Sequence, residues 1–385
     1  MAIAALAASS GGHAASAAKK PIIIGWAYDL KGNMAPFDNP ALAAAKIRIK
    51  QINAKGGAGG RKFQIKTCDT QNNTAATAKS CALSLLGAGA SIIFTTCDVD
   101  FATPVVQETI KRGKLAVAPC IGTDQMGPKR FGKQGKLAFS FGNVAQDEGS
   151  AMAEYARKRG WKTAGLATNT LLVYFKNVVQ AFDKRFRQLG GTIVTRESYA
   201  TGANNVNTAV SRLNSHKADV YVTSTAFGEL PAFVSGLRSL NNKTPILNSW
   251  AGDGTYWVTS SPKVTNYYFV TYASVFGDDP SKDVRKMIAA LKAAGATPFT
   301  GGFLGGADAI DGVFLAIKRA GGATKGSALA AQLEKFNHVA VLGGKISFSS
   351  KLHTVFGRQY RVIKIQNNKA SYVGPVTAKV VPKLP

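Results

Sequence analysis

Residues 22–38 read IIIGWAYDLKGNMAPFD, and this stretch sets the first unit of the fold. Its β-branched start, Ile22 to Gly25, is typical of a strand that is buried on both faces. A glycine-containing loop follows, and from Ala41 the apolar residues recur on one face of a helix. That helix is expected to end at INAKGG, residues 52–57, where glycine supplies a left-handed cap. The stretch therefore predicts a strand, a loop and a helix in succession.

The same unit repeats along the chain. Strands and helices alternate as far as residue 118, and the alternation restarts near residue 151. Such alternation favours parallel sheets with helices on both faces. Two extended segments, Ala138 to Phe141 and Tyr267 to Ala273, are interpreted as crossovers between two lobes. The sequence thus predicts an α/β fold of two doubly wound lobes. Among the expected elements are strands at 63–67, 91–96 and 115–118 and helices at 75–86 and 104–112.

The composition is that of a packed globular protein with an unusual charge. The chain has 385 residues, 45% of them hydrophobic, which suits two or three domains. Lys and Arg number 48 against 21 Asp and Glu, which gives a net charge of +27. The basic residues are scattered, without a basic tail or an aromatic RNA-binding motif, so a general surface adaptation is favoured over nucleic-acid binding. No apolar run approaches the length of about 18 residues that a membrane span needs.

The N-terminus resembles the end of a secretory signal. The first eighteen residues carry no Lys, Arg, Asp or Glu, and Ala15-Ser16-Ala17 is similar to a cleavage site. The positively charged start of such a signal is missing, and a disordered Ala-rich leader is the alternative. We predict a leader over residues 1–20 and a periplasmic or extracellular location.

The cysteines indicate disulfides in one lobe. All four fall in the first third of the chain, and none forms a C-x-x-C pair. Together with four scattered histidines they give no metal-ligand spacing. An even count within one region of an exported chain suits one or two disulfides, and buried free thiols are the alternative. Three pairings remain open for Cys68, Cys81, Cys97 and Cys120.

Catalytic motifs are not found. Gly87-x-Gly89 precedes a strand, so it cannot present a helix N-terminus to a pyrophosphate. The sequence holds no phosphate-binding P-loop and no nucleophile elbow. The carboxylate pairs Asp98 with Asp100 and Asp278 with Asp279 are more typical of solvated or capping groups. We therefore predict a protein that is not an enzyme and needs no cofactor or metal.

Four stretches of the chain have a familiar order: IIIGWAYDLKGNMAPFD (22–38), IKQINAKGGAGGRKFQIKTCDTQ (49–71), FTTCDVDFATPVVQ (94–107) and GKLAVAPCIGTD (113–124). Together they resemble the leucine/isoleucine/valine-binding family of periplasmic receptors for ABC transporters. The resemblance covers nearly the whole chain, from about Pro21 to Val373.

The resemblance implies two α/β lobes that close like a hinge on a small ligand. Three crossovers are expected, near 139–142, 270–273 and 344–349. The expected N-terminal lobe comprises 21–140 and 273–345, and the C-terminal lobe comprises 141–272 and 346–378. Membrane permease subunits are the implied partners of a monomeric receptor that binds no nucleic acid.

The ligand residues of that family map onto both lobes. The family holds a ligand carboxylate by a serine or threonine after the third strand and by a turn after the fourth, which matches Gly122 and Thr123. Asp98 occupies the first of these positions, where an acid would repel a carboxylate. The remaining matches, from the first loop and the opposing lobe, are Phe37, Tyr174, Phe227, Trp250 and Asp253.

Other roles are open for these residues and for the ligand. Thr123 can cap a helix, Asp253 can be a turn residue, and the aromatic side chains can belong to the packing of a lobe. The resemblance favours a branched-chain or related amino acid as the ligand. Asp98 in place of a serine favours an aromatic or short-chain organic acid or an amide. A ligand-sensing regulator without a transporter is a further alternative, because the fold alone does not fix the function.

Overall fold

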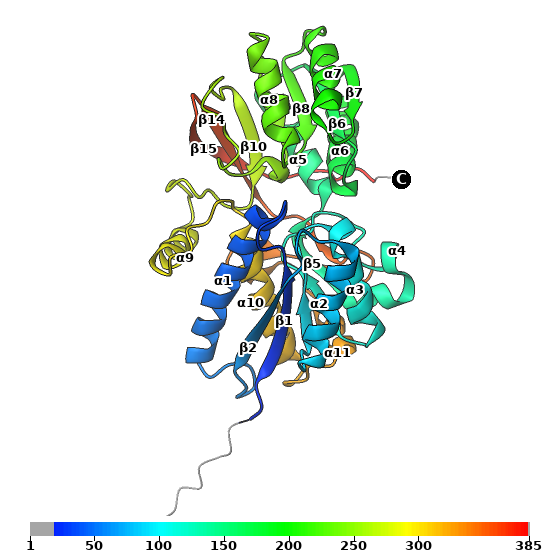
Figure 1. Ribbon diagram of the computed structural model, residues 1–385, viewed down its shortest axis with the longest axis vertical. Coiled ribbons are helices and arrows are strands. Elements are labelled where there is room, and N and C mark those ends of the chain that lie inside the picture. Colours follow the sequence, from blue (N-terminus) through cyan, green and yellow to red (C-terminus); the bar gives the residue numbers. More distant parts are fainter. Residues whose placement is uncertain (1–18, 384–385) are drawn as a thin grey trace, which may run out of the picture.

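The computed structural model describes residues 19–383 (Figure 1). The predicted leader therefore lies outside the described residues, apart from Lys19 and Lys20. The chain forms two α/β lobes that follow one another along the long axis, one built on a six-stranded sheet and the other on a seven-stranded sheet. The predicted fold class, two mainly parallel sheets with helices around them, is confirmed.

The N-terminal lobe has the strand order β13-β5-β4-β3-β1-β2, all parallel. Successive residues of β1 point to opposite faces of this sheet. Trp26 joins the core under α1 and α10, whereas Ala27 joins the core under α2 and α3. The strands are β1 (Ile22–Tyr28), β2 (Phe63–Asp69), β3 (Ile92–Phe94), β4 (Leu115–Ala118), β5 (Ala138–Asn143) and β13 (Thr354–Val355). The helices are α1 (Ala35–Ala54), α2 (Ala75–Gly87), α3 (Val99–Lys111), α4 (Pro128–Phe131), η1 (Gly132–Leu137), α9 (Lys282–Ala293), α10 (Phe303–Arg319) and α11 (Gly326–Leu333), and a hairpin of β11 (Val339–Val341) and β12 (Gly344–Ile346) follows.

The C-terminal lobe has the strand order β15-β14-β10-β9-β8-β6-β7. The strands from β10 to β7 run parallel, and β14 is antiparallel to both of its neighbours. Helix α5 packs on α6, and α7 packs on α8. The strands are β6 (Thr163–Asn169), β7 (Thr192–Tyr199), β8 (Val220–Ser224), β9 (Ile246–Asn248), β10 (Tyr267–Thr271), β14 (Tyr360–Gln366) and β15 (Lys369–Val376). The helices are α5 (Ala145–Lys158), α6 (Val173–Gln188), α7 (Ala203–Asn214), α8 (Glu229–Ser239) and η2 (Trp250–Gly252).

Three segments carry the chain from one lobe to the other. The first joins β5 to α5, and the second joins β10 to α9, close to where the sequence suggested crossovers. The third falls between β13 and β14, later than the expected segment 344–349, because the chain adds the short strand β13 to the N-terminal sheet before it leaves the lobe. A strand of two residues has no periodicity from which it could be predicted.

One residue from each crossing meets in a buried cluster between the lobes. The backbone N–H of Asn143 donates to the Tyr272 hydroxyl at 3.1 Å. The Arg358 guanidinium lies 5.7 Å from the centre of the Tyr272 ring, and its Nη2 lies 3.1 Å from Asp308 Oδ2 on α10. Asn143, Tyr272, Asp308 and Arg358 are all buried. The three crossings therefore share one polar core.

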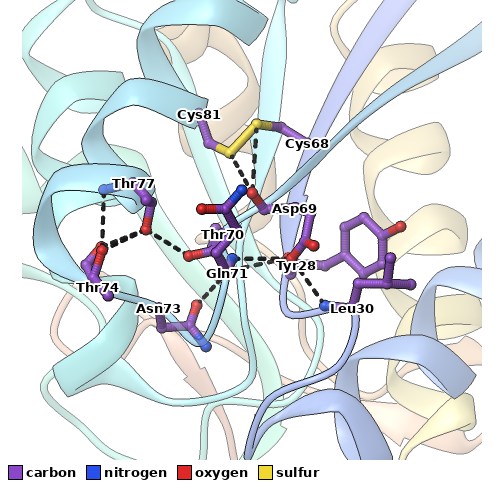
Figure 2. The surroundings of a disulfide bond; sticks show 10 residues. All are labelled: Tyr28, Leu30, Cys68, Asp69, Thr70, Gln71, Asn73, Thr74, Thr77 and Cys81. Atoms are coloured by element: carbon purple, nitrogen blue, oxygen red, sulfur yellow. Dashed lines mark hydrogen bonds between the residues drawn. A yellow bond between two sulfur atoms is a disulfide. The ribbon is translucent and has the colours of Figure 1, made fainter.

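The four cysteines pair within the N-terminal lobe. Cys68 of β2 is bonded to Cys81 of α2, and Cys97 after β3 is bonded to Cys120 after β4. Figure 2 shows the first bond beside the end of β2, where Thr70 N donates to the Tyr28 carbonyl at 2.9 Å. The second bond joins the two loops that leave the centre of the sheet.

Candidate functional site

The loops at the carboxyl ends of both sheets face each other between the lobes, where ligands of parallel α/β sheets bind. Phe37 in the first turn of α1 meets Trp250 of η2, with ring centres 4.9 Å apart in an edge-to-face arrangement. Tyr256 adds a second ring, 6.5 Å from Phe37. Phe37 and Trp250 are buried. The structure thus places two predicted residues in direct contact across the cleft.

The loop after β4 meets the start of α6. A Cβ atom on Gly122 would lie 2.7 Å from the Tyr174 ring, so only glycine allows this close approach. The hydroxyl of the next residue, Thr123, donates to Asn177 Oδ1 at 3.3 Å. Gly122, Thr123 and Tyr174 are therefore brought together as the sequence suggested, with the glycine and threonine on one lobe and the tyrosine on the other.

Asp253 follows η2 and is fully buried. Its Oδ2 accepts hydrogen bonds from the Thr271 hydroxyl and the Gly301 backbone N–H, both at 2.6 Å. Its Oδ1 has no partner among residues 19–383. Desolvation by burial raises the pKa of Asp253 to about 7. This oxygen atom is therefore available to a positively charged donor, which would stabilise the ionised form.

Glu148 is a second buried acid at the cleft, and the sequence did not reveal it. It lies in the first turn of α5 with no exposed surface. Its Oε1 accepts from the Trp250 backbone N–H, and its Oε2 accepts from the Tyr174 hydroxyl at 2.8 Å. Burial raises the pKa of Glu148 to about 7. Glu148 thus positions two of the predicted residues.

Asp98 and Phe227 do not join this group. Asp98 is the N-cap of α3, where its Oδ1 accepts from the backbone N–H groups of Asp100 and Phe101 at 2.8 and 3.4 Å. Burial raises its pKa to about 7. Phe227 follows β8 in a left-handed conformation (φ 55°) and packs on Phe175, with ring centres 6.2 Å apart. In a sequence, an acid that caps a helix cannot be told from an acid that contacts a ligand. Helix α3 was expected to begin at Pro104, too far along the chain for Asp98 to be its cap.

Two further features complete the cleft. Thr95 comes directly after β3 and is buried, and its hydroxyl has no hydrogen-bond partner within the described chain. This hydroxyl is therefore free to bond a ligand, and the sequence reasoning did not name it. Asp100 Oδ2 accepts the Val173 backbone N–H at 3.0 Å and so links the lobes.

The described residues offer no metal centre and no membrane-spanning helix. No cluster of three or more His, Cys, Asp or Glu side chains between residues 19 and 383 is placed to hold a metal ion. Over the same range, no helix is long and apolar enough to cross a membrane. The chemistry of the cleft is that of binding, with hydroxyl groups, acids and aromatic rings from both lobes.

Two lobes, three crossings and facing polar loops define a type I periplasmic binding protein. The model of a family described as periplasmic binding protein matches residues 21–370. The chain therefore belongs to the periplasmic binding protein family, whose members are binding proteins and not enzymes. The predicted family and the predicted absence of enzymatic activity are confirmed.

Similar proteins differ in the ligand that they hold. The chain is 24% identical over 338 residues to the Leu/Ile/Val-binding protein homolog 3 of Brucella melitensis, which covers 87% of this chain and 89% of that protein. The branched-chain amino acid transporter substrate-binding protein LivJ of Streptococcus pneumoniae, solved with isoleucine, has a TM-score of 0.79 at 20% identity over 94% of this chain and all of that one. A solute-binding protein of an ABC transporter from Rhodopseudomonas palustris, solved with 3,4-dihydroxybenzoic acid, has a TM-score of 0.77 at 17% identity over 94% and 99%.

Proposed function

We propose that the chain is the extracytoplasmic solute-binding protein of an ABC importer and that it binds a branched-chain or related amino acid between its lobes. Membership of the periplasmic binding protein family supports the first part. The similarity to a Leu/Ile/Val-binding protein homolog and to a receptor solved with isoleucine supports the second. In this role the protein is exported and delivers its ligand to membrane permease subunits.

The observation that carries the amino-acid proposal is the state of Asp253. A buried carboxyl group with one oxygen atom lacking a partner is costly unless a donor reaches it. The ammonium group of an amino acid is such a donor, and Phe37 and Trp250 supply apolar surface for a side chain next to it. The N-terminal lobe offers the free hydroxyl of Thr95 to the carboxylate, and the Thr123 hydroxyl can join it by exchanging its bond to Asn177 for one to the ligand.

An aromatic acid is the second candidate. The aromatic rings of Phe37, Trp250 and Tyr256 lie together at the cleft and could cover a planar ligand. A similar protein was solved with 3,4-dihydroxybenzoic acid. Such a ligand has no ammonium group. An amino acid therefore needs the Asp253 carboxylate as a partner, and an aromatic acid does not.

A thermal-shift screen tests the proposal. Leucine, isoleucine and valine are compared with benzoate and 3,4-dihydroxybenzoate, on the wild-type chain and on Asp253→Asn. A ligand at 100 times its dissociation constant adds about 2.7 kcal/mol to the free energy of unfolding. We expect stabilisation by an aliphatic amino acid that is lost in Asp253→Asn. Stabilisation by the aromatic acids alone, retained in the variant, would replace the amino-acid proposal with the aromatic-acid one.

A further inference from the structure

Two adjoining cavities on the C-terminal lobe form a groove that the cleft does not explain. Their volumes are about 480 and 390 Å³, and they share Tyr155, Lys158 and Pro375 as lining residues. They lie between the last turn of α5, which packs on β15, and the strands β14 and β15. Figure 1 shows the two strands side by side at one edge of this lobe. We call the two cavities together the basic groove.

The basic groove concentrates positive charge. The Lys and Arg side chains that line it without making an ion pair come from α5 and the loop after it, from β14 and from the chain after β15. Among the lining residues that the structure describes, Glu154 is the single acid, and it is already paired with Arg185 at 2.8 Å. Glu154 Oε1 also accepts the Lys379 backbone N–H at 3.0 Å. The cationic residues that make no ion pair in the structure are Arg157, Lys158, Arg159, Lys364 and Lys379.

Two of these cations lie near the same aromatic ring, that of Tyr268. The Arg159 guanidinium lies 5.9 Å from the centre of the Tyr268 ring, and Lys364 Nζ lies 5.6 Å from the same centre. Arg159 also lies 5.9 Å from the Trp161 ring. Cation–π attraction keeps such groups in place. Two like charges on one ring nevertheless repel each other, and an anion between them would relieve that repulsion.

We propose that the basic groove binds phosphate groups. The planar guanidinium of Arg159 can hold two phosphate oxygens at once, while Lys158 and Lys364 act as point charges beside it. Phosphate esters in solution and phospholipid headgroups present the same chemistry, so either source fits the groove.

The groove and the amino-acid site lie at opposite ends of helix α5. Helix α5 begins at the cleft with Glu148 in its first turn and reaches the groove in its last turn. At 1.5 Å per residue, the ten residues from Glu148 to Lys158 separate the two sites by roughly 15 Å. Phosphate binding in the groove can therefore be tested separately from ligand binding in the cleft.

The test compares two variants of equal charge, because the surface as a whole is basic. Nine of the 21 acidic residues are buried but only three of the 48 basic ones, so the positive excess lies at the surface. The groove variant is Lys158→Gln/Arg159→Gln/Lys364→Gln. The control, Lys46→Gln/Lys50→Gln/Lys133→Gln, removes three exposed charges from the N-terminal lobe. Melting temperature without ligand checks that both variants fold.

Two arms separate the sources of phosphate. Calorimetry with inorganic pyrophosphate reports on soluble phosphate, and sedimentation with phosphatidylglycerol vesicles reports on headgroups, both at about 0.15 M salt to screen the diffuse field. We expect at least a tenfold loss of affinity in the groove variant and less than a twofold loss in the control. A loss in the pyrophosphate arm identifies a soluble ligand, and a loss with vesicles alone identifies a lipid headgroup. Equal losses in the two variants, or no binding by the wild-type chain in either arm, would overturn the inference.

Discussion

The two lobes bring different chemistry to the cleft. The N-terminal lobe contributes a glycine and neutral hydroxyls, namely Gly122, Thr123 and Thr95, from loops that follow its central strands. The C-terminal lobe contributes the buried acids Glu148 and Asp253 together with aromatic rings. Such a division suits a ligand with a negative end and a positive end, held with its carboxylate toward one lobe and its ammonium toward the other.

The lobes also differ in what holds their loops. Cys97 and Cys120 join the two N-terminal loops covalently, whereas the C-terminal loops depend on hydrogen bonds such as that from Trp250 to Glu148. A neutral hydrogen-bond donor contributes little binding free energy to each contact with a ligand. Such donors must therefore be held in position before the ligand binds. A buried carboxylate attracts a positively charged ligand group more strongly, so its loop can be less rigid.

The largest expected effect comes from removing the Cys97–Cys120 bond. Cys97→Ser/Cys120→Ser should lower the free energy of unfolding by about 3 kcal/mol, because the unfolded chain regains the freedom of the closed loop. It should also weaken ligand binding, because both N-terminal loops loosen. The matched control, Cys68→Ser/Cys81→Ser, should lose similar stability in chemical denaturation and keep its affinity. Equal losses of affinity in both variants would refute the special role of the Cys97–Cys120 loops.

The next effect tests the acid of the C-terminal lobe. Asp253→Asn keeps the shape of the side chain and removes its charge, so affinity for an amino acid should fall by roughly 1.5–3 kcal/mol in calorimetry. Asp283→Asn, an exposed acid on α9, serves as the control and should bind as the wild type does. Unchanged affinity in Asp253→Asn would show that Asp253 is a structural turn residue that does not contact the ligand.

The pH dependence of binding follows from the same residue. The pKa of Asp253 is raised from 3.8 to about 7, so the carboxyl group is largely protonated below that pH. An ammonium ligand needs the ionised form, and affinity should therefore rise about tenfold between pH 6 and pH 8. Binding at pH 6 should release a proton, which calorimetry in buffers of different ionisation enthalpy measures. Proton uptake would contradict an ammonium at Asp253.

The unliganded protein should show the opposite trend in stability. Between about pH 4 and pH 7 the folded Asp253 holds a proton that the unfolded chain has lost. The free energy of unfolding should therefore decrease as the pH rises through this window, as far as Asp253 and the similarly raised Glu148 are concerned. Denaturant titrations of the wild-type chain and Asp253→Asn across that range would show a flatter dependence in the variant.

The smallest effect concerns a neutral hydroxyl. Thr123→Ala should weaken ligand binding by about 0.5–1.5 kcal/mol, the usual contribution of one neutral hydrogen bond. Thr103→Ala, a threonine of α3 that bonds only within its own helix, is the control. A loss in Thr123→Ala as large as that in Asp253→Asn would remove the difference between the lobes.

The sequence predicted the parts of the fold that local patterns determine. β1 was expected from residue 22 and is found at Ile22–Tyr28, because its β-branched run needs a doubly buried position. Helix α3 was expected from Pro104, but it begins at Val99 behind the Asp98 cap. Proline marks the first turn of many helices, and here it lies further inside. Asp98 was accordingly placed in a loop before the helix, where a solvated, capping or ligand-contacting role was open to it.

The contacts of the site depend on residues far apart in the chain. Glu148 is separated from Trp250 by 102 residues, and no local pattern joins them. The only sequence signal was an acid within EGSAMA, a run of small residues on a buried helix. The resemblance to a family supplied Gly122, Thr123, Tyr174 and Asp253, but the sequence could not show that Gly122 packs on Tyr174 or that Asp253 bonds Thr271 and Gly301.

The most direct test of the account is a crystal structure of the protein with leucine at saturating concentration. We expect the ammonium group within hydrogen-bonding distance of Asp253 Oδ1 and the carboxylate facing Thr123 and Thr95. A ligand in the reverse orientation, or a cleft without leucine in crystals grown at that concentration, would contradict it.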